Sequence, residues 1–569
     1  MRRPGDPTKR PLKIFTLDPE TSRVDGGIAT IEVPWEPLEA GPSGRLFIVD
    51  PNDGDTALAG VDLDDPRILI RGGLDPSVID RRFHQQMVYA VSARVYAQFQ
   101  AALGRVIAWG FDSPAHPGRL LLRPHVEAFG ADAAYEPEEG TVSFGYFPGP
   151  DTGAGRCPPK GRVYTCLSHD AIVHEMTHAL LDGLRSRFTV PTSGDVPGFH
   201  EGFADLVAVF QHFTHRDVLV KEIARARGDL RDAQLLTGLA DQLGLTTRGR
   251  PLRCAINTEK VRYRSEMEPH EMGSVLLSAV FAAFVRIYQR KTQRYVRLGV
   301  RPDASYLPYE LVEILASQAE ALAEQFLRLC IRAVDYCPPL DMQLGEYLRA
   351  MITADRELVP DDPWGYRDAL IEAFAERGIY PDGVGQLSED ALSWSPPTRS
   401  IEPITALHFS NLRFAGDPSL PAGPNELIRQ AESLWDFVTR RHVAEEFGLA
   451  PPGVDGVEPC TIESVRTANR VGPDGQVLFD LVAELTQRRK VLDPETGLES
   501  KIFGGATLII GPEGEIRYAI VKHARSDARL ARQLSYQRTS PWWTRAEGRY
   551  KMRGYAHRLA HEPDWRTSS

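Results

Sequence analysis

Cysteine is scarce in this 569-residue sequence, in which the six cysteines stand at positions 157, 166, 254, 330, 337 and 460. They are too few for a disulfide scaffold, and no two of them have the C-x-x-C spacing of a zinc ribbon. We therefore expect reduced, mostly buried thiols. The alternative is a disulfide between Cys157 and Cys166, which would close a ten-residue loop in an oxidising compartment.

Long apolar runs are also missing. The longest uncharged apolar stretch, Met272 to Val285, has 14 residues, which is short of the roughly 20 that cross a bilayer. The N-terminus carries charges and prolines but no apolar segment typical of a signal peptide. The sequence therefore predicts a soluble cytoplasmic protein with no membrane partner, and it leaves export by a route not encoded at the N-terminus open.

An excess of positive charge is absent as well. Lys and Arg number 66 against 77 Asp and Glu, a net charge of −11, which argues against a protein that coats nucleic acid. Residues 521–569 are an exception, because they hold eleven basic and four acidic residues interleaved with aromatic ones. A solvated basic face is the favoured interpretation of this tail, and single-stranded nucleic acid or another anionic partner is the alternative.

The hydrophobic periodicity divides the chain into regions. We expect a β-rich segment over 1–80, a region over 81–390 that combines helices with two extended segments at 120–129 and 141–147, and a linker over 391–403, where proline and serine cluster. Residues 404–569 read as a separate α+β domain with two hairpins, turning at 472–475 and 511–514. Apolar residues at helical spacing predict helices at 81–106, 168–188, 198–213, 270–292, 306–335, 341–357 and 364–377.

The sequence His174-Glu175-Met-Thr-His178 is the most informative motif. An apolar stripe occupies one face of this predicted helix, which leaves the two histidines one turn apart on another face. That is the spacing at which two imidazoles bind the same zinc ion. Glu175, beside the first ligand, is placed to accept a proton from activated water. Ser168 or Asp170 is expected to cap the start of the helix.

A third ligand would separate a zinc site from a structural helix that merely carries two histidines. The second predicted helix contains His200-Glu201-Gly-Phe-Ala-Asp205, in which Glu201 and Asp205 share one face. Glu201 follows His178 by 23 residues, enough for a loop and a returning helix. Glu201 is therefore the candidate third ligand. Asp205 is the candidate acceptor for the outer ring N–H of a zinc-bound histidine.

These two helices resemble the core of the thermolysin-like gluzincin metallopeptidases, which carries H-E-x-x-H and a downstream E-x-x-x-D. The resemblance covers about residues 80–380. It implies an α+β fold in which a β-rich N-terminal lobe and a mainly α-helical C-terminal lobe flank the zinc helices, and it implies zinc as the cofactor. No Gly-x-Met-Glu-Asn motif occurs, which favours an endopeptidase over the aminopeptidase branch of the gluzincins.

The resemblance also assigns residues outside the two helices. An edge strand with an N-A-F-W-like stretch lies along the substrate in this family, and the stretch that begins at Asp132 and Ala133 is similar to it, with Asp132 in place of the usual Asn. These two residues are thereby implied in substrate binding. His270, which precedes a long apolar segment, resembles the family's transition-state histidine. His200 stands where the family often has Asn before the ligand Glu and is implied as a supporting residue.

Two family features have no definite counterpart. No tyrosine lies between His178 and Glu201, so His212 or a tyrosine in a loop is left for the family's active-site tyrosine. The substrate-clamping arginine has three candidates, each of which also reads as an ordinary surface charge: Arg250, Arg253 and Arg262. No D-x-D-x-D-G calcium loop is present.

The sequence thus predicts a zinc metalloendopeptidase that cleaves peptides or proteins, with Glu175 as the general base and His270 as a donor to the developing oxyanion. The alternative is a weakly active or inactive zinc-binding protein that acts through its C-terminal domain. The sequence assigns no role to the C-terminal domain; one hypothesis is that residues 400–569 restrain the activity, either by covering the cleft or by selecting substrates.

Overall fold

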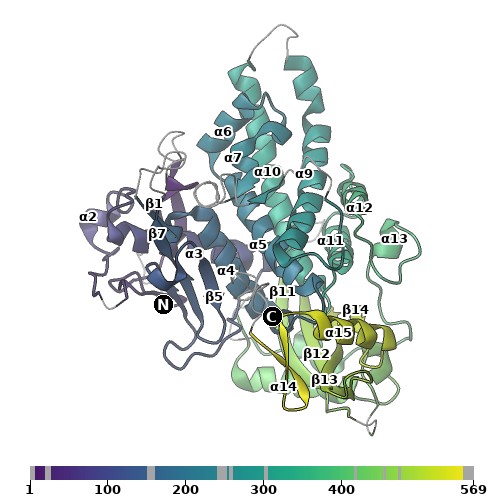
Figure 1. Cartoon of the computed structure of the whole chain (residues 1–569). Coiled ribbons are helices and arrows are strands. Elements are labelled where there is room, and N and C mark those ends of the chain that lie inside the picture. Colours follow the sequence, from purple (N-terminus) through teal and green to yellow (C-terminus); the bar gives the residue numbers. More distant parts are fainter. Residues whose placement is uncertain are drawn as a thin grey trace.

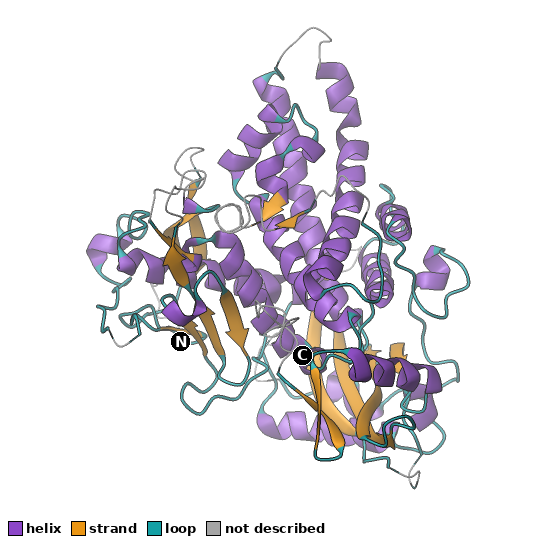
Figure 2. Cartoon of the chain, in the orientation of Figure 1, coloured by secondary structure: helices purple, strands orange, loops and turns teal. Residues whose placement is uncertain are grey.

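The computed structural model describes residues 7–19, 27–54, 56–149, 161–239, 253–255, 261–299, 306–414, 420–451, 453, 456–471 and 476–554. Over these residues the protein is mixed α and β, with a β-rich N-terminal region and a helical middle, as predicted (Figure 1). Figure 2 shows a second group of strands near the C-terminus, beside the helical middle.

The N-terminal region is built from short strands and one long helix, α3 (Arg81–Leu103). Its main sheet has the strand order β3-β4-β6-β5, in which β5 is an edge strand antiparallel to β6. α3 packs on this sheet, and Phe47 of β3 contacts the rings of Tyr89 and Tyr96. The strands and remaining helix are β1 (Lys9–Phe15), β2 (Ile28–Pro34), β3 (Phe47–Val49), α2 (Pro66–Leu69), β4 (Leu120–Arg123), β5 (Ala133–Glu136), β6 (Thr141–Phe144), β7 (Tyr146–Pro148) and β8 (Arg162–Tyr164).

All seven predicted helices are present, α3 in the N-terminal region and the other six in the helical middle, with ends that differ from the prediction by up to seven residues. Aromatic residues of three of these helices, among them Phe210, Phe284 and Phe326, pack against one another in the core. Among the described helices, α9 alone is long and apolar enough to cross a membrane, but 78% of its apolar window is buried inside the protein, as in a core helix. The elements are α4 (His169–Leu184), α5 (Asp195–His212), α6 (Arg216–Arg225), α7 (Gln234–Thr237), β9 (Gly238–Leu239), β10 (Arg253–Cys254), α9 (Pro269–Gly299), α10 (Tyr309–Ala333), α11 (Leu344–Leu358), α12 (Tyr366–Glu376) and α13 (Glu389–Leu392).

The C-terminal region is a mixed sheet with two helices. Both predicted hairpins are present as the antiparallel pairs β11–β12 and β13–β14, although the turn at 472–475 lies outside the described residues. Most of its apolar side chains form their own cluster, but Val482, Ile509 and Ile520 belong to the main core. The elements are α14 (Pro424–Val438), β11 (Thr461–Val471), β12 (Val477–Leu492), β13 (Glu499–Ile510), β14 (Ile516–Lys522), α15 (Asp527–Thr539), β15 (Trp543–Ala546) and β16 (Arg549–Met552).

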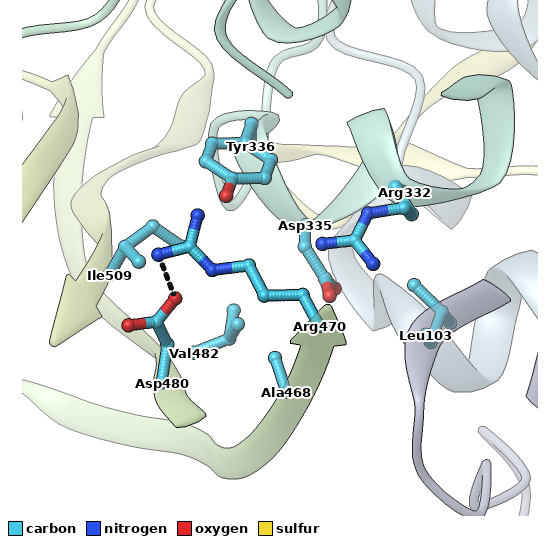
Figure 3. Close-up of a pocket in the computed structure, with 9 residues that line it drawn as sticks. All are labelled: Leu103, Arg332, Asp335, Tyr336, Ala468, Arg470, Asp480, Val482 and Ile509. Carbon is cyan, nitrogen blue, oxygen red and sulfur yellow. Dashed lines mark ion pairs between the residues drawn. The ribbon is translucent and has the colours of Figure 1, made fainter. Parts of the chain in front are cut away.

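Buried charges join the C-terminal sheet to the helical middle. Figure 3 shows a small cavity at this junction, lined by residues of α3, of the end of α10 and the turn that follows it, and of the sheet. Arg470 and Asp480 form an ion pair of 2.9 Å there. Burial raises the pKa of Asp480 to about 6, even though Arg470 acts in the opposite direction. Beside the cavity, Arg105 contacts Asp335 through two hydrogen bonds of 2.7 Å.

The C-terminal sheet also contacts the end of α4, the helix that carries His174 and His178. Arg466 donates a hydrogen bond of 2.7 Å to the carbonyl of Leu184, the last residue of α4. Arg185, which follows and is fully buried, pairs with Glu484 at 3.1 Å. Residues 404–569 therefore support the C-terminal end of α4.

The described cysteines agree with the expectation of buried thiols. Cys166, Cys330, Cys337 and Cys460 are buried and carry free thiols. The alternative disulfide of Cys166 lies outside the described residues, because Cys157 is not among them.

Candidate metal centre

The two motif histidines lie next to each other on α4. Their Nε2 atoms are 3.1 Å apart, and both residues are buried. Ser168 occupies the N-cap position but its side chain makes no capping hydrogen bond. Asp170, the other expected cap, instead lies 2.6 Å from His212 Nε2. The expected side-chain cap is therefore wrong, because Asp170 bonds to a neighbouring helix.

Glu201 of α5 completes a set of three ligand atoms. Its Oε2 lies 3.3 Å from His174 Nε2, and its Oε1 lies 3.6 Å from His178 Nε2. Two ligands bound about 2.0–2.1 Å from a zinc ion at tetrahedral angles lie roughly 3.3 Å apart. The spacing and the chemistry of the three donors therefore fit zinc. Glu201 is fully buried, so a bound cation would also compensate its charge.

A second layer of side chains holds the outer nitrogens of both histidines. Asp205 Oδ1 lies 3.0 Å from His174 Nδ1, the position predicted for this carboxylate. His200 Nδ1 lies 3.5 Å from His178 Nδ1. Burial lowers the pKa of His200 to about 4, so this imidazole is neutral at pH 7 and can accept a hydrogen bond. Such partners fix the tautomer and the orientation of metal-binding histidines.

Glu175 connects the zinc helix to the edge strand β5. The backbone N–H of Tyr135 donates a hydrogen bond of 2.9 Å to Glu175 Oε2, and a carboxylate oxygen of Glu175 lies within 4.8 Å of donor atoms of both motif histidines. Ala133 is buried in β5, and its N–H bonds to Asp132 Oδ1 at 3.0 Å. Since residues two apart in a strand direct their backbone groups to the same side, Ala133 and Tyr135 present theirs to the same edge.

Tyr135 contributes to the site although its residue type gives no signal for that role. Besides its amide, its hydroxyl donates a hydrogen bond of 2.8 Å to Asp182 in the last turn of α4. Burial raises the pKa of Asp182 to about 6, against the effect of this bond. The strand and the helix are therefore joined at both Glu175 and Asp182. Tyr135 lies two residues after Ala133, which the sequence predicted as a substrate-binding residue. Because residues two apart in a strand direct their backbone groups to the same side, this spacing is the only sequence signal for the contact of the Tyr135 amide.

His270 reaches the ligand set because α9 and α5 approach closely. A Cβ atom at Gly273 would lie 2.7 Å from the amide nitrogen of Gly202, so only glycine permits this contact. One turn earlier, His270 Nε2 lies 3.2 Å from Glu201 Oε2. Its side chain is 27% exposed, more than the buried ligands. This placement agrees with the predicted position of His270 beside the zinc ligands.

Glu268 orients His270 from the other side of the ring. Its Oε1 lies 2.8 Å from His270 Nδ1. Burial opposes the charged form of Glu268, but its hydrogen bonds with His270 outweigh this effect and lower the pKa of the carboxyl group. In the sequence, Glu268 stands two residues before His270. This short spacing is the signal that could have predicted the contact.

The remaining candidates lie elsewhere or are not described. His212 is paired with Asp170. Arg262 is exposed, Arg250 lies outside the described residues, and only the backbone of Arg253 is described, in the short strand β10.

Together, these residues can bind a divalent metal and place a carboxylate and an imidazole beside it. The edge of a sheet is held against the same helix. Neither protein-family models nor curated proteins gave a match to this chain.

Proposed function

We propose that the protein is a zinc metalloendopeptidase with a thermolysin-like catalytic region. The observation that carries this proposal is the convergence of His174, His178 and Glu201 from two helices: the two Nε2 atoms lie 3.1 Å apart, and the Glu201 carboxylate places one oxygen 3.3 Å from His174 Nε2 and the other 3.6 Å from His178 Nε2. Two histidines and one glutamate are a typical ligand set of catalytic zinc, which keeps one coordination position open.

The residues around this set have the chemistry that peptide hydrolysis requires. Zinc in such a site activates water and polarises a carbonyl group. Glu175, held by the amide of Tyr135, takes up the proton of the attacking water and returns it to the leaving amine. His270, when protonated on both nitrogens, donates one N–H to Glu268 and the other to the developing oxyanion.

The edge strand β5 supports an extended peptide as the substrate. β5 pairs with β6 along one side, and its other side carries the amide that reaches Glu175. A peptide that adds to such an edge is recognised through its backbone with little demand on its sequence. This mode of binding suits an endopeptidase, because it makes no use of a free chain terminus.

The substitution Glu175→Gln tests the proposal. It keeps the size of the side chain and an oxygen for the Tyr135 amide but removes the base. We expect wild type and variant to bind zinc equally by elemental analysis, and only wild type to cleave casein. Glu271→Gln, on the exposed side of the first turn of α9, is the matched control and should retain activity. Undiminished cleavage by Glu175→Gln would refute the assignment of the base.

A zinc-binding protein without turnover is the second candidate. His270 Nε2 lies 3.2 Å from Glu201 Oε2, so a fourth protein donor stands near the ligand set, and four protein ligands are typical of structural zinc sites. Equal zinc content without cleavage in wild type and in both variants would favour this function.

A further inference from the structure

A second group of metal-ligand side chains lies outside the centre described above. His84 of α3, His125 after β4 and Cys166 before α4 are all buried, and their donor atoms lie within 4.8 Å of one another. The three residues come from distant parts of the sequence and from three different elements. We propose that they form a second site, for a thiophilic divalent metal of the zinc class.

The hydrogen bonds of His84 leave one ring nitrogen directed at the other two residues. His84 Nε2 lies 3.0 Å from the carbonyl of Val78, to which it donates its proton. His84 Nδ1 therefore carries a lone pair in the neutral ring. It lies 2.9 Å from His125 Nε2 and 3.7 Å from Cys166 Sγ. A carbonyl on the outer nitrogen is the usual second-layer partner of a metal-binding histidine.

The three donors lie close enough to share one ion, and two of their separations can be compared with those of a tetrahedral site. Nitrogen and sulfur ligands bound at about 2.0–2.1 Å and 2.3 Å from zinc lie roughly 3.6 Å apart, and two nitrogens roughly 3.3 Å apart. The separation of 3.7 Å between Cys166 Sγ and His84 Nδ1 matches the first value. The separation of 2.9 Å between the imidazoles is slightly short, as is the 3.1 Å between the two histidines of the first centre.

The protonation of the cluster also suits a metal. Both imidazoles are buried, and a neutral imidazole keeps one ring nitrogen with a lone pair that can bind a metal. When the metal binds, Cys166 loses its thiol proton to solvent and the thiolate sulfur becomes the ligand.

The donor set restricts the class of ion. Two imidazoles and one thiolate favour zinc or other thiophilic metals and disfavour calcium and magnesium, which take oxygen ligands. Cys166 lies in the 3₁₀ turn Thr165–Leu167, which leads directly into α4. An ion at this site would therefore tie the start of the zinc helix to α3 and to the N-terminal sheet.

Cobalt substitution tests the second site on the full chain. The metal-free protein is reconstituted with Co²⁺, which takes the place of zinc and produces an intense sulfur-to-cobalt absorption only where a thiolate is bound. We expect two equivalents of cobalt per chain and this absorption in wild type. Cys166→Ala should lose the absorption and one equivalent. The matched control Cys460→Ala, another buried thiol, should keep both.

Substitution of the first centre separates this inference from the proposed function. A His174→Ala, His178→Ala double variant should lose one equivalent of cobalt and keep the sulfur absorption, whether or not the wild type cleaves peptides. A single equivalent in wild type without sulfur absorption, or an absorption that survives in Cys166→Ala, would overturn the second site. His125→Gln, which should also lose the second equivalent, covers the case in which Cys166→Ala does not fold.

Discussion

Asp205 provides a quantitative test of how the proposed zinc ligands are held. Its Oδ1 lies 3.0 Å from His174 Nδ1, and the residue is 1% exposed, so water does not replace this contact readily. Asp205→Asn keeps the shape and one acceptor oxygen but removes the negative charge that strengthens His174 as a donor to the metal. Loss of such a partner typically weakens metal binding by about 10- to 100-fold, which corresponds to roughly 1.4 to 2.8 kcal/mol of binding free energy.

The assay is a competition for zinc between the protein and a chromogenic chelator at fixed pH. It is carried out in a Cys166→Ala background, so that only the first centre is titrated. Asp182→Asn is the matched control, because Asp182 is a buried carboxyl group on α4 that accepts a hydrogen bond from Tyr135. We expect its dissociation constant for zinc to equal that of the background protein.

Two results would refute this reasoning. If Asp205→Asn binds zinc as tightly as the background protein, the carboxylate does not support His174. If Asp182→Asn weakens zinc binding as much as Asp205→Asn does, the effect is a general one of removing a buried charge and not a property of the histidine contact.

Two further predictions concern the oxyanion donor and pH. His270→Gln should retain zinc but lower kcat by about 10²- to 10³-fold, and a change confined to KM would contradict the assigned role. Burial raises the pKa of Asp182 from 3.8 to about 6, so the folded state favours the neutral acid. As the pH rises from 4 to 7, this group therefore lowers the free energy of unfolding of the wild type by up to about 3 kcal/mol. Asp182→Asn should therefore be more stable than wild type in urea at pH 8 but not at pH 4, and an equal gain at both pH values would contradict this cause.

The helices of the middle region follow from the sequence because their apolar residues recur at helical spacing over many turns. β1 (Lys9–Phe15) shows the opposite case, since a proline and basic residues obscure the alternation of a strand. Arg10 in this strand is fully buried, and it donates a hydrogen bond of 2.6 Å to the carbonyl of Leu63. The hydropathy scale rates every arginine as strongly polar, whether or not a hydrogen-bond partner compensates its charge. The sequence therefore predicts that Arg10 is exposed.

The same distinction applies to the candidate site. His174, His178 and Glu201 follow from residue types at helical spacing, so local geometry predicts them. The amide of Tyr135 cannot be predicted from residue type, because every residue except proline has one. The cluster of His84, His125 and Cys166 has no local pattern at all, since its members stand 41 and 82 residues from the first. Only the tertiary packing of α3, the segment after β4 and the turn before α4 brings them together.

The composition around 391–403 indicates a linker between the helical middle and the C-terminal region. It carries no information on the buried ion pairs that connect these two regions. Arg185 at the end of α4 is fully buried and pairs with Glu484 of the C-terminal sheet. Deleting residues 404–569 would remove the partner of this charge, and an unpaired charge that stays buried typically costs about 3–5 kcal/mol. Loss of activity in such a deletion would therefore report instability of the zinc helix. A regulatory role of the C-terminal region must instead be sought with substitutions on its exposed surface, which leave Arg185 and Glu484 in contact.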